Sequence, residues 1–311
     1  MANFFNDTTN AQFIPTIIAQ KALGRFGAYM NLAKTVSRDF EWTASTFGKT
    51  ISVPKRGALV ANSKTAGNAV SLQNPTATNI NVVLNNHYEV SFAIDDVTAV
   101  LQNQDTMAGY AEDAAIALAE QVEISITSLY PSFTYDDTMP ASPSATQVDS
   151  TLLTLRKRFS DQKVPRLETR YLYCDPSLVN TILTQDRYTR YDALGRVGAN
   201  IETESDSQPI MRPIYGFTIF ESQNIQSSGS PAAFHNIAYT KNAFILAARP
   251  LPEIPAGYGA VSTVISDDDV NMGLRVVSSY DSTNLGIQMT LDVLWGVSIL
   301  DQRRVAGLDS F

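Results

Sequence analysis

The sequence predicts an α+β protein, because a long helix and a long antiparallel strand pair are its clearest patterns. Over residues 105–130, apolar side chains recur every three or four positions, the period of a helix with one buried face. Over residues 285–299, every odd position is apolar, which only a strand with one buried face requires. The 311 residues are enough for one large domain or two modest ones.

The composition excludes several classes of protein. Apolar residues make up 44% of the chain, too many for a disordered protein, and the net charge of −8 argues against an electrostatic nucleic-acid binder. The one cysteine, Cys174, excludes a disulfide framework or a thiolate metal cluster within one chain. There is no signal-peptide pattern and no apolar run of ~18 residues, so we expect a chain made in the cytosol without a membrane span.

The charge is distributed unevenly along the chain. Residues 1–88 carry a net charge of +5, and the other 223 residues carry a net charge of −13. One end of a subunit could therefore dock on the other end of a neighbour, whereas the alternative is compositional drift in a monomer. The candidate inter-subunit contacts in the basic part are Arg25, Arg38, Lys49, Lys55, Arg56 and Lys64.

The first hundred residues predict an arm, a helix and a long polar loop. The first ten residues are typical of a mobile arm, and a broken helical period follows, for which we expect a helix that begins near Pro15. Residues 50–54 and 88–94 alternate as strands do. Between them, residues 57–79 contain few large apolar groups, which indicates the tip of a two-stranded arm that needs a neighbour for stability.

The long helix is predicted to extend ~37 Å. Asp105 or Thr106 can cap its first turn, and Pro131 is expected to end it. Its alanines and its acidic face favour packing on a sheet over the competing interpretation, a coiled coil.

A mixed α/β region is expected after a proline-containing connector over residues 131–146. Asp149 is expected to cap one helix, and Asp175 followed by Pro176 is expected to cap another. Short strands are predicted at 171–174 and 214–220, on either side of a polar, flexible segment over 186–213.

The C-terminal strand is expected to pair with residues 274–280 across a turn and to return to the long helix. Its eight alternations make it longer than common strands, so Gly296 is expected to mark a bend or bulge.

No motif points to catalysis. Gly48-Lys49-Thr50 lacks the first glycine of a phosphate loop and precedes a strand instead of a helix. Asp267-Asp268-Asp269 begins like a calcium loop, but the glycine and final acid are misplaced, which favours a solvated turn. Asp95-Asp96 is expected at an element boundary, Cys174 in the core and His87 on the surface. We therefore expect no catalytic, cofactor or metal site.

The order of these elements resembles the major capsid proteins of tailed bacteriophages, which share the Hong Kong 97 phage capsid fold, and is closest to short-tailed phage coat proteins. An N-terminal arm, a polar-tipped hairpin, a long helix, an α/β region and a closing strand pair follow one another in that order. The local likenesses are Phe13-Ile14-Pro15, Leu32-Ala33, Val36-Ser37-Arg38-Asp39-Phe40-Glu41, Gly48-Lys49-Thr50-Ile51-Ser52-Val53-Pro54, Tyr88-Glu89-Val90-Ser91-Phe92-Ala93-Ile94-Asp95-Asp96 and Leu291-Asp292-Val293-Leu294-Trp295-Gly296-Val297.

The resemblance implies four parts. Residues 1–40 would be the N-arm, and residues 41–92 an extended loop, the E-loop, that lies over a neighbouring subunit. A peripheral domain over 93–130 and 260–311 would pack the long spine helix on an antiparallel sheet. An axial α/β domain over 131–259 would meet its copies at the five-fold and quasi-six-fold axes.

The implied function is a major capsid protein whose pentamers and hexamers form the icosahedral head shell around double-stranded DNA. Because no long segment precedes the N-arm, we expect a separate scaffolding protein, together with a portal and a candidate cement protein. DNA would be contacted weakly. The location would be the virion, with assembly in the host cytoplasm, and neither enzyme activity, cofactor nor membrane is expected. The alternatives are a cellular nanocompartment shell of the same fold and a soluble α/β enzyme with an unrecognised site.

Overall fold

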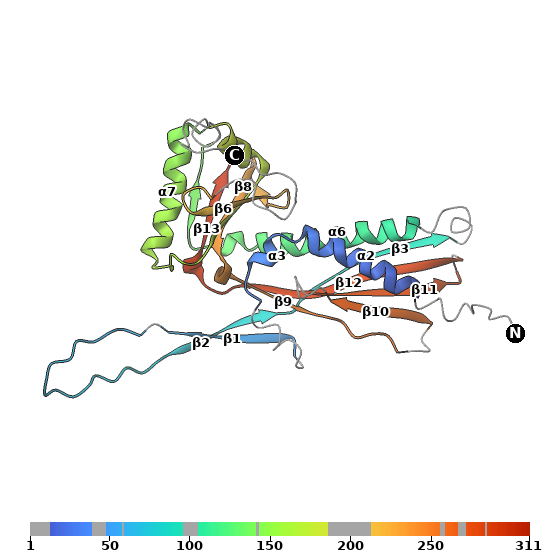
Figure 1. Cartoon of the computed structure of the whole chain (residues 1–311), viewed down its shortest axis with the longest axis horizontal. Helices are drawn as coiled ribbons and strands as arrows, with labels where there is room; N and C mark the ends of the chain where they lie inside the picture. The colour runs from blue at the N-terminus through green and yellow to red at the C-terminus, as the bar shows by residue number, and fades with distance from the viewer. Residues whose placement is uncertain are drawn as a thin grey trace.

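The computed structural model describes residues 13–38, 48–57, 59–95, 105–140, 143–185, 213–255, 259–266, 272–283 and 285–311. These form an elongated molecule in which an α/β body stands at one end of a long sheet, and a two-stranded hairpin projects below it (Figure 1). The expectations for residues 1–10, for Asp96, for most of 186–213 and for Asp267-Asp268-Asp269 lie outside the described residues.

The first sheet, here called the main sheet, has five strands and confirms the α+β class. β12 pairs antiparallel with β3 and β11, β11 pairs with β10, and the far end of β12 pairs with β9. The strands are β3 (Asn86–Asp95), β9 (Phe244–Arg249), β10 (Ala260–Ser266), β11 (Gly273–Asp281) and β12 (Gly286–Ile299). The expected pairing of 274–280 with the C-terminal strand is therefore confirmed.

The alternation that predicted β12 corresponds to its buried face. Met289, Leu291, Val293 and Trp295 are each at most 1% exposed and lie in the core between the main sheet and the helices. Leu285 continues the apolar pattern but precedes the strand, and it is 59% exposed. The buried face of β12 therefore begins after Leu285.

Helices α2 (Phe13–Tyr29) and α6 (Asp105–Thr127) lie over one face of the main sheet (Figure 1). The small side chains of Ala111, Ala115 and Ala119 are fully buried, which lets the two helices approach closely. α6 contacts β3 and β12, which agrees with packing on a sheet and contradicts the coiled-coil alternative. α2 begins at Phe13, before the expected Pro15, and a short helix α3 (Leu32–Thr35) follows it.

The α/β body contains the second sheet, in the order β4-β13-β8-β5-β6, with β7 paired to β8. Its strands are β4 (Asp136–Thr138), β5 (Arg170–Cys174), β6 (Phe217–Glu221), β7 (Ser227–Ser228), β8 (Ala233–Thr240) and β13 (Val305–Ser310). Helices α7 (Ala145–Asp161) and α8 (Pro176–Leu183) pack on it around a second core. Short 3₁₀ turns lie at Tyr130–Ser132, Lys241–Ala243 and Gln302–Arg304.

One of the two predicted caps in this body is wrong. α7 begins one turn before Asp149, because Ser144 and Gln147 form a capping box in which the Ser144 N–H donates to Gln147 Oε1 at 2.8 Å. Asp149 instead accepts a hydrogen bond from Tyr215 Oη at 3.1 Å. The other cap is confirmed, because Asp175 accepts from the N–H groups at the start of α8 and Pro176 occupies its first turn.

Two strands pair in a different sheet from the one that their position in the sequence predicts. β9 comes from the α/β region of the sequence but pairs with β12 in the main sheet. β13 ends the chain, and it pairs with β8 and β4 in the second sheet. The strand pair of β11 and β12 returns to the long helix as expected, because β12 contacts α6. The main sheet and the α/β body are therefore joined by the exchanged strands β9 and β13 as well as by α6.

Candidate inter-subunit arm

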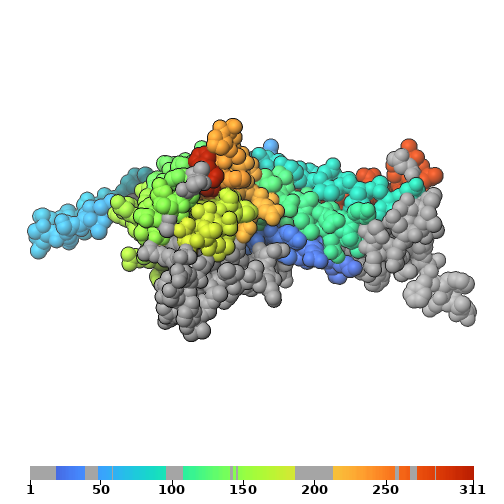
Figure 2. All heavy atoms as spheres, turned by 90° about the horizontal axis from the view of Figure 1, so that it is seen from above, coloured from blue at the N-terminus to red at the C-terminus, as the bar shows by residue number. Residues whose placement is uncertain are grey.

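The projecting arm, residues 48–84, consists of β1 (Thr50–Arg56), β2 (Ala77–Val83) and the loop between them. Its second strand is β2, and not residues 88–94, which form part of β3 in the main sheet. β1 and β2 pair antiparallel from Thr50 opposite Val83 to Arg56 opposite Ala77. Figure 2 shows the loop end of the arm standing clear of the other atoms.

The arm beyond the strands has no core of its own. Every described side chain from residue 57 to residue 79 is exposed. The Gly57 N–H donates to Thr76 O at 2.8 Å, the Val60 N–H donates to Gln73 Oε1 at 3.0 Å, and a turn forms near Asn68. These contacts keep the two sides of the loop together without removing it from solvent.

Four large apolar side chains lie in this exposed loop. The exposed fractions are 68% for Leu59, 68% for Val60, 65% for Val70 and 91% for Leu72. Apolar side chains gathered on a projecting element with no core are typical of an interaction surface, because a neighbour can bury what the chain itself leaves in water.

The base of the arm packs firmly on the main sheet. Ile51, Val53, Val82 and Leu84 form a small core with Ile245 and Ala247 of β9, and Leu300 packs against it. Val83 of β2 crosses β12 at Gly296, where an added Cβ would lie 2.3 Å from the Val83 carbonyl oxygen. β12 runs unbroken through this position, so Gly296 permits a close approach and does not mark the expected bend or bulge.

We expect the substitution Gly296→Ala to lift the base of the arm from the sheet, because the Val83 carbonyl belongs to the backbone and must shift. Thermal unfolding should show a loss of about 1–3 kcal/mol, as for other overpacked sites. Hydrogen exchange should accelerate in β1 and β2 but not in β11. Gly109→Ala, in open space on α6, is the matched control.

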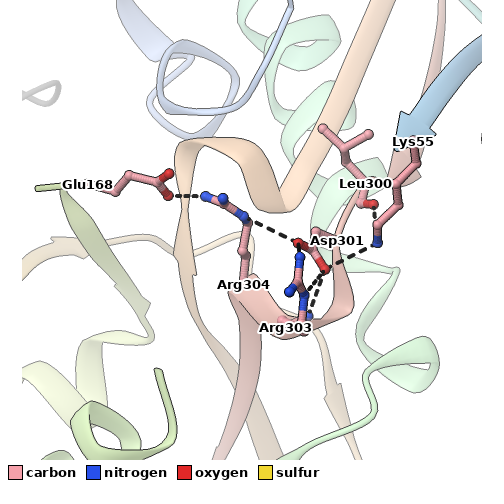
Figure 3. Close-up of polar contacts among 6 residues, drawn as sticks. All are labelled: Lys55, Glu168, Leu300, Asp301, Arg303 and Arg304. Carbon is pink, nitrogen blue, oxygen red and sulfur yellow. Dashed lines mark hydrogen bonds and ion pairs between the residues drawn. The ribbon is translucent and has the colours of Figure 1, made fainter. Parts of the chain in front are cut away.

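An ionic cluster joins the base of the arm to the segment after β12 of the main sheet and to the α/β body (Figure 3). Asp301 accepts from Lys55 Nζ at 3.2 Å, from Arg303 Nη2 at 2.8 Å and from Arg304 Nε at 3.3 Å. Lys55 also donates to the Leu300 carbonyl oxygen, and Arg304 pairs with Glu168, which precedes β5. Partial burial of Asp301 opposes its ionisation, but hydrogen bonds from Arg303 and the charge of Lys55 lower its pKa to about 2.

The lowered pKa predicts how this cluster responds to acid. Because the folded-state pKa of Asp301 lies below its unfolded value of about 3.9, its contribution to stability is present above that value. The contribution should disappear as the pH falls from about 4 through about 2. Urea unfolding at several pH values should show a shallower acid loss for Asp301→Asn than for the wild type, with Asp161→Asn, an exposed carboxyl, as the control.

The six predicted contact residues differ in their surroundings. Lys49, Arg56 and Lys64 are exposed on the arm. Arg25 pairs with Glu112 at 3.2 Å between α2 and α6, and Lys55 pairs with Asp301. Arg38, which is half-buried, follows Ser37, whose backbone bridges to β9. The chain itself therefore supplies partners for Arg25 and Lys55, whereas the side chains of Lys49, Arg56 and Lys64 are exposed to solvent.

Glu123 is an interior residue that the sequence analysis did not identify. It lies on α6 and is 2% exposed. Its carboxylate accepts from the N–H groups of Asn31 at 2.6 Å and Leu32 at 3.0 Å, and from Tyr173 Oη at 2.5 Å. Burial raises its pKa, although these hydrogen bonds oppose the shift. Glu123 thus joins the N-terminal helices, α6 and β5.

The sequence analysis did not identify one polar array in the α/β body, in which Ser228 Oγ lies 2.7 Å from His235 Nε2 and His235 Nδ1 lies 2.6 Å from Asp309 Oδ1. Cys174 is fully buried as expected, and burial raises the pKa of its thiol. His87 is exposed as expected and lies 3.2 Å from Asp292. Within the described ranges, no group of three acidic, histidine or cysteine side chains could hold a metal ion. No described helix has the length and apolarity needed to span a membrane.

Comparison with solved structures identifies the fold. A chain from Mycobacterium phage Che8 superposes with a TM-score of 0.61 at 16% identity, covering 88% of each chain. The capsid of cyanophage P-SCSP1u gives 0.62 at 12% identity, covering 90% of this chain and 86% of the other. A virus-like particle from Pyrococcus furiosus gives 0.52 at 11% identity, covering 94% and 97%. The protein therefore has the fold of phage capsid subunits. No protein-family model and no curated protein matches the sequence.

Proposed function

We propose that this chain is the major capsid protein of a tailed bacteriophage and that its pentamers and hexamers form the head shell around double-stranded DNA. The observation that carries the proposal is the arm, whose loop exposes Leu59, Val60, Val70 and Leu72 without a core of its own. The capsid fold over nearly the whole chain supports the same assignment. The mechanism is packing, in which modest interfaces are repeated over many subunits.

The proposal includes the division into an N-arm (1–40), an extended loop (41–92), a peripheral domain (93–130 and 260–311) and an axial domain (131–259). The projecting position of β1 and β2 supports the extended loop, whose free part ends near Leu84 because β3 pairs with β12. In this arrangement the α/β body is the axial domain, with two exceptions to the linear ranges: β9, within 131–259, joins the main sheet, and β13, within 260–311, joins the α/β body.

The proposed partners are other copies of the chain, a separate scaffolding protein, a portal and a cement protein. Assembly takes place in the host cytoplasm. The net charge of −8 supports a container that confines DNA and contacts it weakly.

A cellular nanocompartment shell is the second candidate. The similarity to the virus-like particle from Pyrococcus furiosus favours it, because that particle is aligned over 94% of this chain. Its TM-score of 0.52 is below the values of 0.61 and 0.62 for the two phage structures.

Expression of the chain with and without a candidate scaffolding protein tests these assignments. We expect closed shells by negative-stain microscopy and a large species by size exclusion. A monodisperse monomer under every assembly condition would overturn the shell function. Shells that form without a scaffold and enclose an enzyme would favour the nanocompartment.

A further inference from the structure

A chain of hydrogen bonds joins a serine, a histidine and an aspartate in the α/β body. Ser228 Oγ lies 2.7 Å from His235 Nε2, and His235 Nδ1 lies 2.6 Å from Asp309 Oδ1. The serine and the aspartate therefore contact opposite nitrogens of one imidazole ring. Neighbours in this array are 7 and 74 positions apart in the sequence, so no local motif indicates it.

The second sheet fixes the three residues relative to one another. His235 of β8 lies directly opposite Asp309 of β13. Ser228 of β7 lies opposite Ala233, two residues before His235. Residues two apart on a strand share a face, so Ser228, His235 and Asp309 project from the same side of the sheet. The Tyr130 ring stacks on the imidazole with 3.8 Å between the ring centroids, which holds the imidazole in its orientation.

The carboxylate determines which imidazole nitrogen carries the proton. An ionised carboxylate only accepts hydrogen bonds, so Nδ1 of the neutral ring donates to Asp309. Nε2 then has a free lone pair and accepts the hydrogen bond from the Ser228 hydroxyl. A serine in this position can pass its proton to the ring as it attacks an electrophilic carbon, which is how a Ser-His-Asp triad activates its nucleophile.

Exposure distinguishes this array from a buried structural network. Ser228 is exposed, whereas His235 is 7% exposed and Asp309 is partly buried. Water can satisfy an exposed hydroxyl, so folding does not require His235 as the partner of Ser228. A reactant in solution can reach Ser228 Oγ, while the histidine and the aspartate stay in place beneath it.

A second carboxylate restricts the charge of the reactant. Asp136 of β4 pairs with Gly307, two residues before Asp309 on β13. Burial and the negative charge of Asp309 raise the pKa of Asp136, and His235 opposes the shift. Two carboxylates beside the imidazole repel an anionic reactant. The site therefore suits an uncharged electrophile.

We propose that Ser228, His235 and Asp309 form a nucleophilic site that takes the acyl group of a neutral carboxylic ester. Ser228 Oγ forms a bond to the carbonyl carbon, and its proton passes to His235 Nε2. The bond from that carbon to the leaving alkoxide breaks as the alkoxide takes the proton, and water then releases the acid by the same route. Asp309 is a positioning residue. The inference goes beyond the proposed shell function and needs only the folded chain.

A fluorophosphonate probe tests the nucleophile in the full-length chain. The probe forms a P–O bond to an activated serine and releases fluoride, and mass spectrometry should locate the adduct on Ser228. Labelling should be roughly a hundredfold or more faster than in the same chain unfolded in urea, which is the gain expected from a general base. Ser228→Ala should lose the adduct. Ser227→Ala, an exposed serine on the opposite face of the same strand, is the matched control and should react as the wild type does.

Ester turnover and rescue test the roles of the other two residues. With p-nitrophenyl acetate, the wild type should release about one nitrophenolate per subunit in an initial burst, and Ser228→Ala should lose this burst. His235→Ala should lose most of the gain in labelling rate, and added imidazole should restore part of it. Asp309→Ala should also slow labelling, whereas Asp309→Glu should retain more of the rate. Thermal unfolding of each variant shows whether the fold is intact.

Three outcomes would overturn the site. They are labelling of the wild type no faster than in the unfolded chain, an adduct on a residue other than Ser228, and wild-type labelling by a folded His235→Ala variant. The first two need only the wild type, so they decide the question even where a variant does not fold. Shell formation is measured separately, and its failure would leave the reactivity of Ser228 unchanged.

Discussion

Removal of residues 58–75, with Gly57 joined to Thr76 through an Asn-Gly turn, is expected to leave a folded subunit that forms no stable shells. The free energy of unfolding should change by less than about 1 kcal/mol, because shortening an exposed loop alters only its closure entropy. The removed side chains that the structure describes are all exposed, so no core is lost. Urea unfolding measures the first effect, and negative-stain microscopy with sizing measures the second.

A full-length variant separates the contribution of the apolar side chains to assembly from that of the length of the loop. Replacement of Leu59, Val60, Val70 and Leu72 by Ser retains the loop but removes the groups that a neighbour would bury. Each such group contributes about 1.5–3 kcal/mol when it is fully buried, so shells should become unstable here too. The matched control replaces Ser63, Thr65, Ser71 and Thr76 by Ala, which changes exposed polar groups of the same loop. Normal shells from the deletion variant would show that the arm has no inter-subunit role.

The elements with long regular patterns could be predicted from the sequence. The alternation along β12 and the helical period of α6 persist over many residues, so the buried faces over residues 289–295 and 111–126 were identified correctly. Leu285, at the start of the alternation, is exposed instead. Asp175 followed by Pro176 is a local cap signal, and the structure confirms it. The prediction of Asp149 as a helix cap was wrong because the capping box of Ser144 and Gln147 lies one turn earlier and starts the helix there.

Features set by distant contacts could not be predicted. β8 is buried on both faces, so its sequence lacks the alternation that reveals a strand with one exposed face. Glycine within a strand often marks a bend, which is what the sequence predicted for Gly296. The close approach of the Val83 carbonyl oxygen, which leaves no room for a Cβ, explains why the residue is glycine. Lys55 and Asp301 are 246 positions apart, so no local spacing indicates their ion pair. The loop of the arm was predicted because the scarcity of large apolar groups over residues 57–79 is itself a local property, although its second strand was expected at residues 88–94 instead of β2.

Glu123→Ala is expected to be among the most destabilising single substitutions. It removes the acceptor of the Asn31 and Leu32 N–H groups and of Tyr173 Oη, all at a buried position. Stranding these donors should cost about 3 kcal/mol or more, measured by urea unfolding. Glu120→Ala, on the exposed face of the same helix, should change stability by less than about 0.5 kcal/mol.

Glu123→Gln separates the role of the acceptor from that of the charge. An amide retains one oxygen for the two N–H groups and can donate to the tyrosine oxygen, so the loss should be much smaller than for Ala. Burial raises the folded-state pKa of Glu123 above 4.5, so the folded wild type holds its proton more tightly than the unfolded chain does. Its stability should therefore fall as the pH rises above about 4.5 through the folded-state pKa, whereas the Gln variant lacks this dependence. The stability gap between wild type and Gln should narrow with rising pH, and a gap that widens would contradict the buried, proton-retaining state of Glu123.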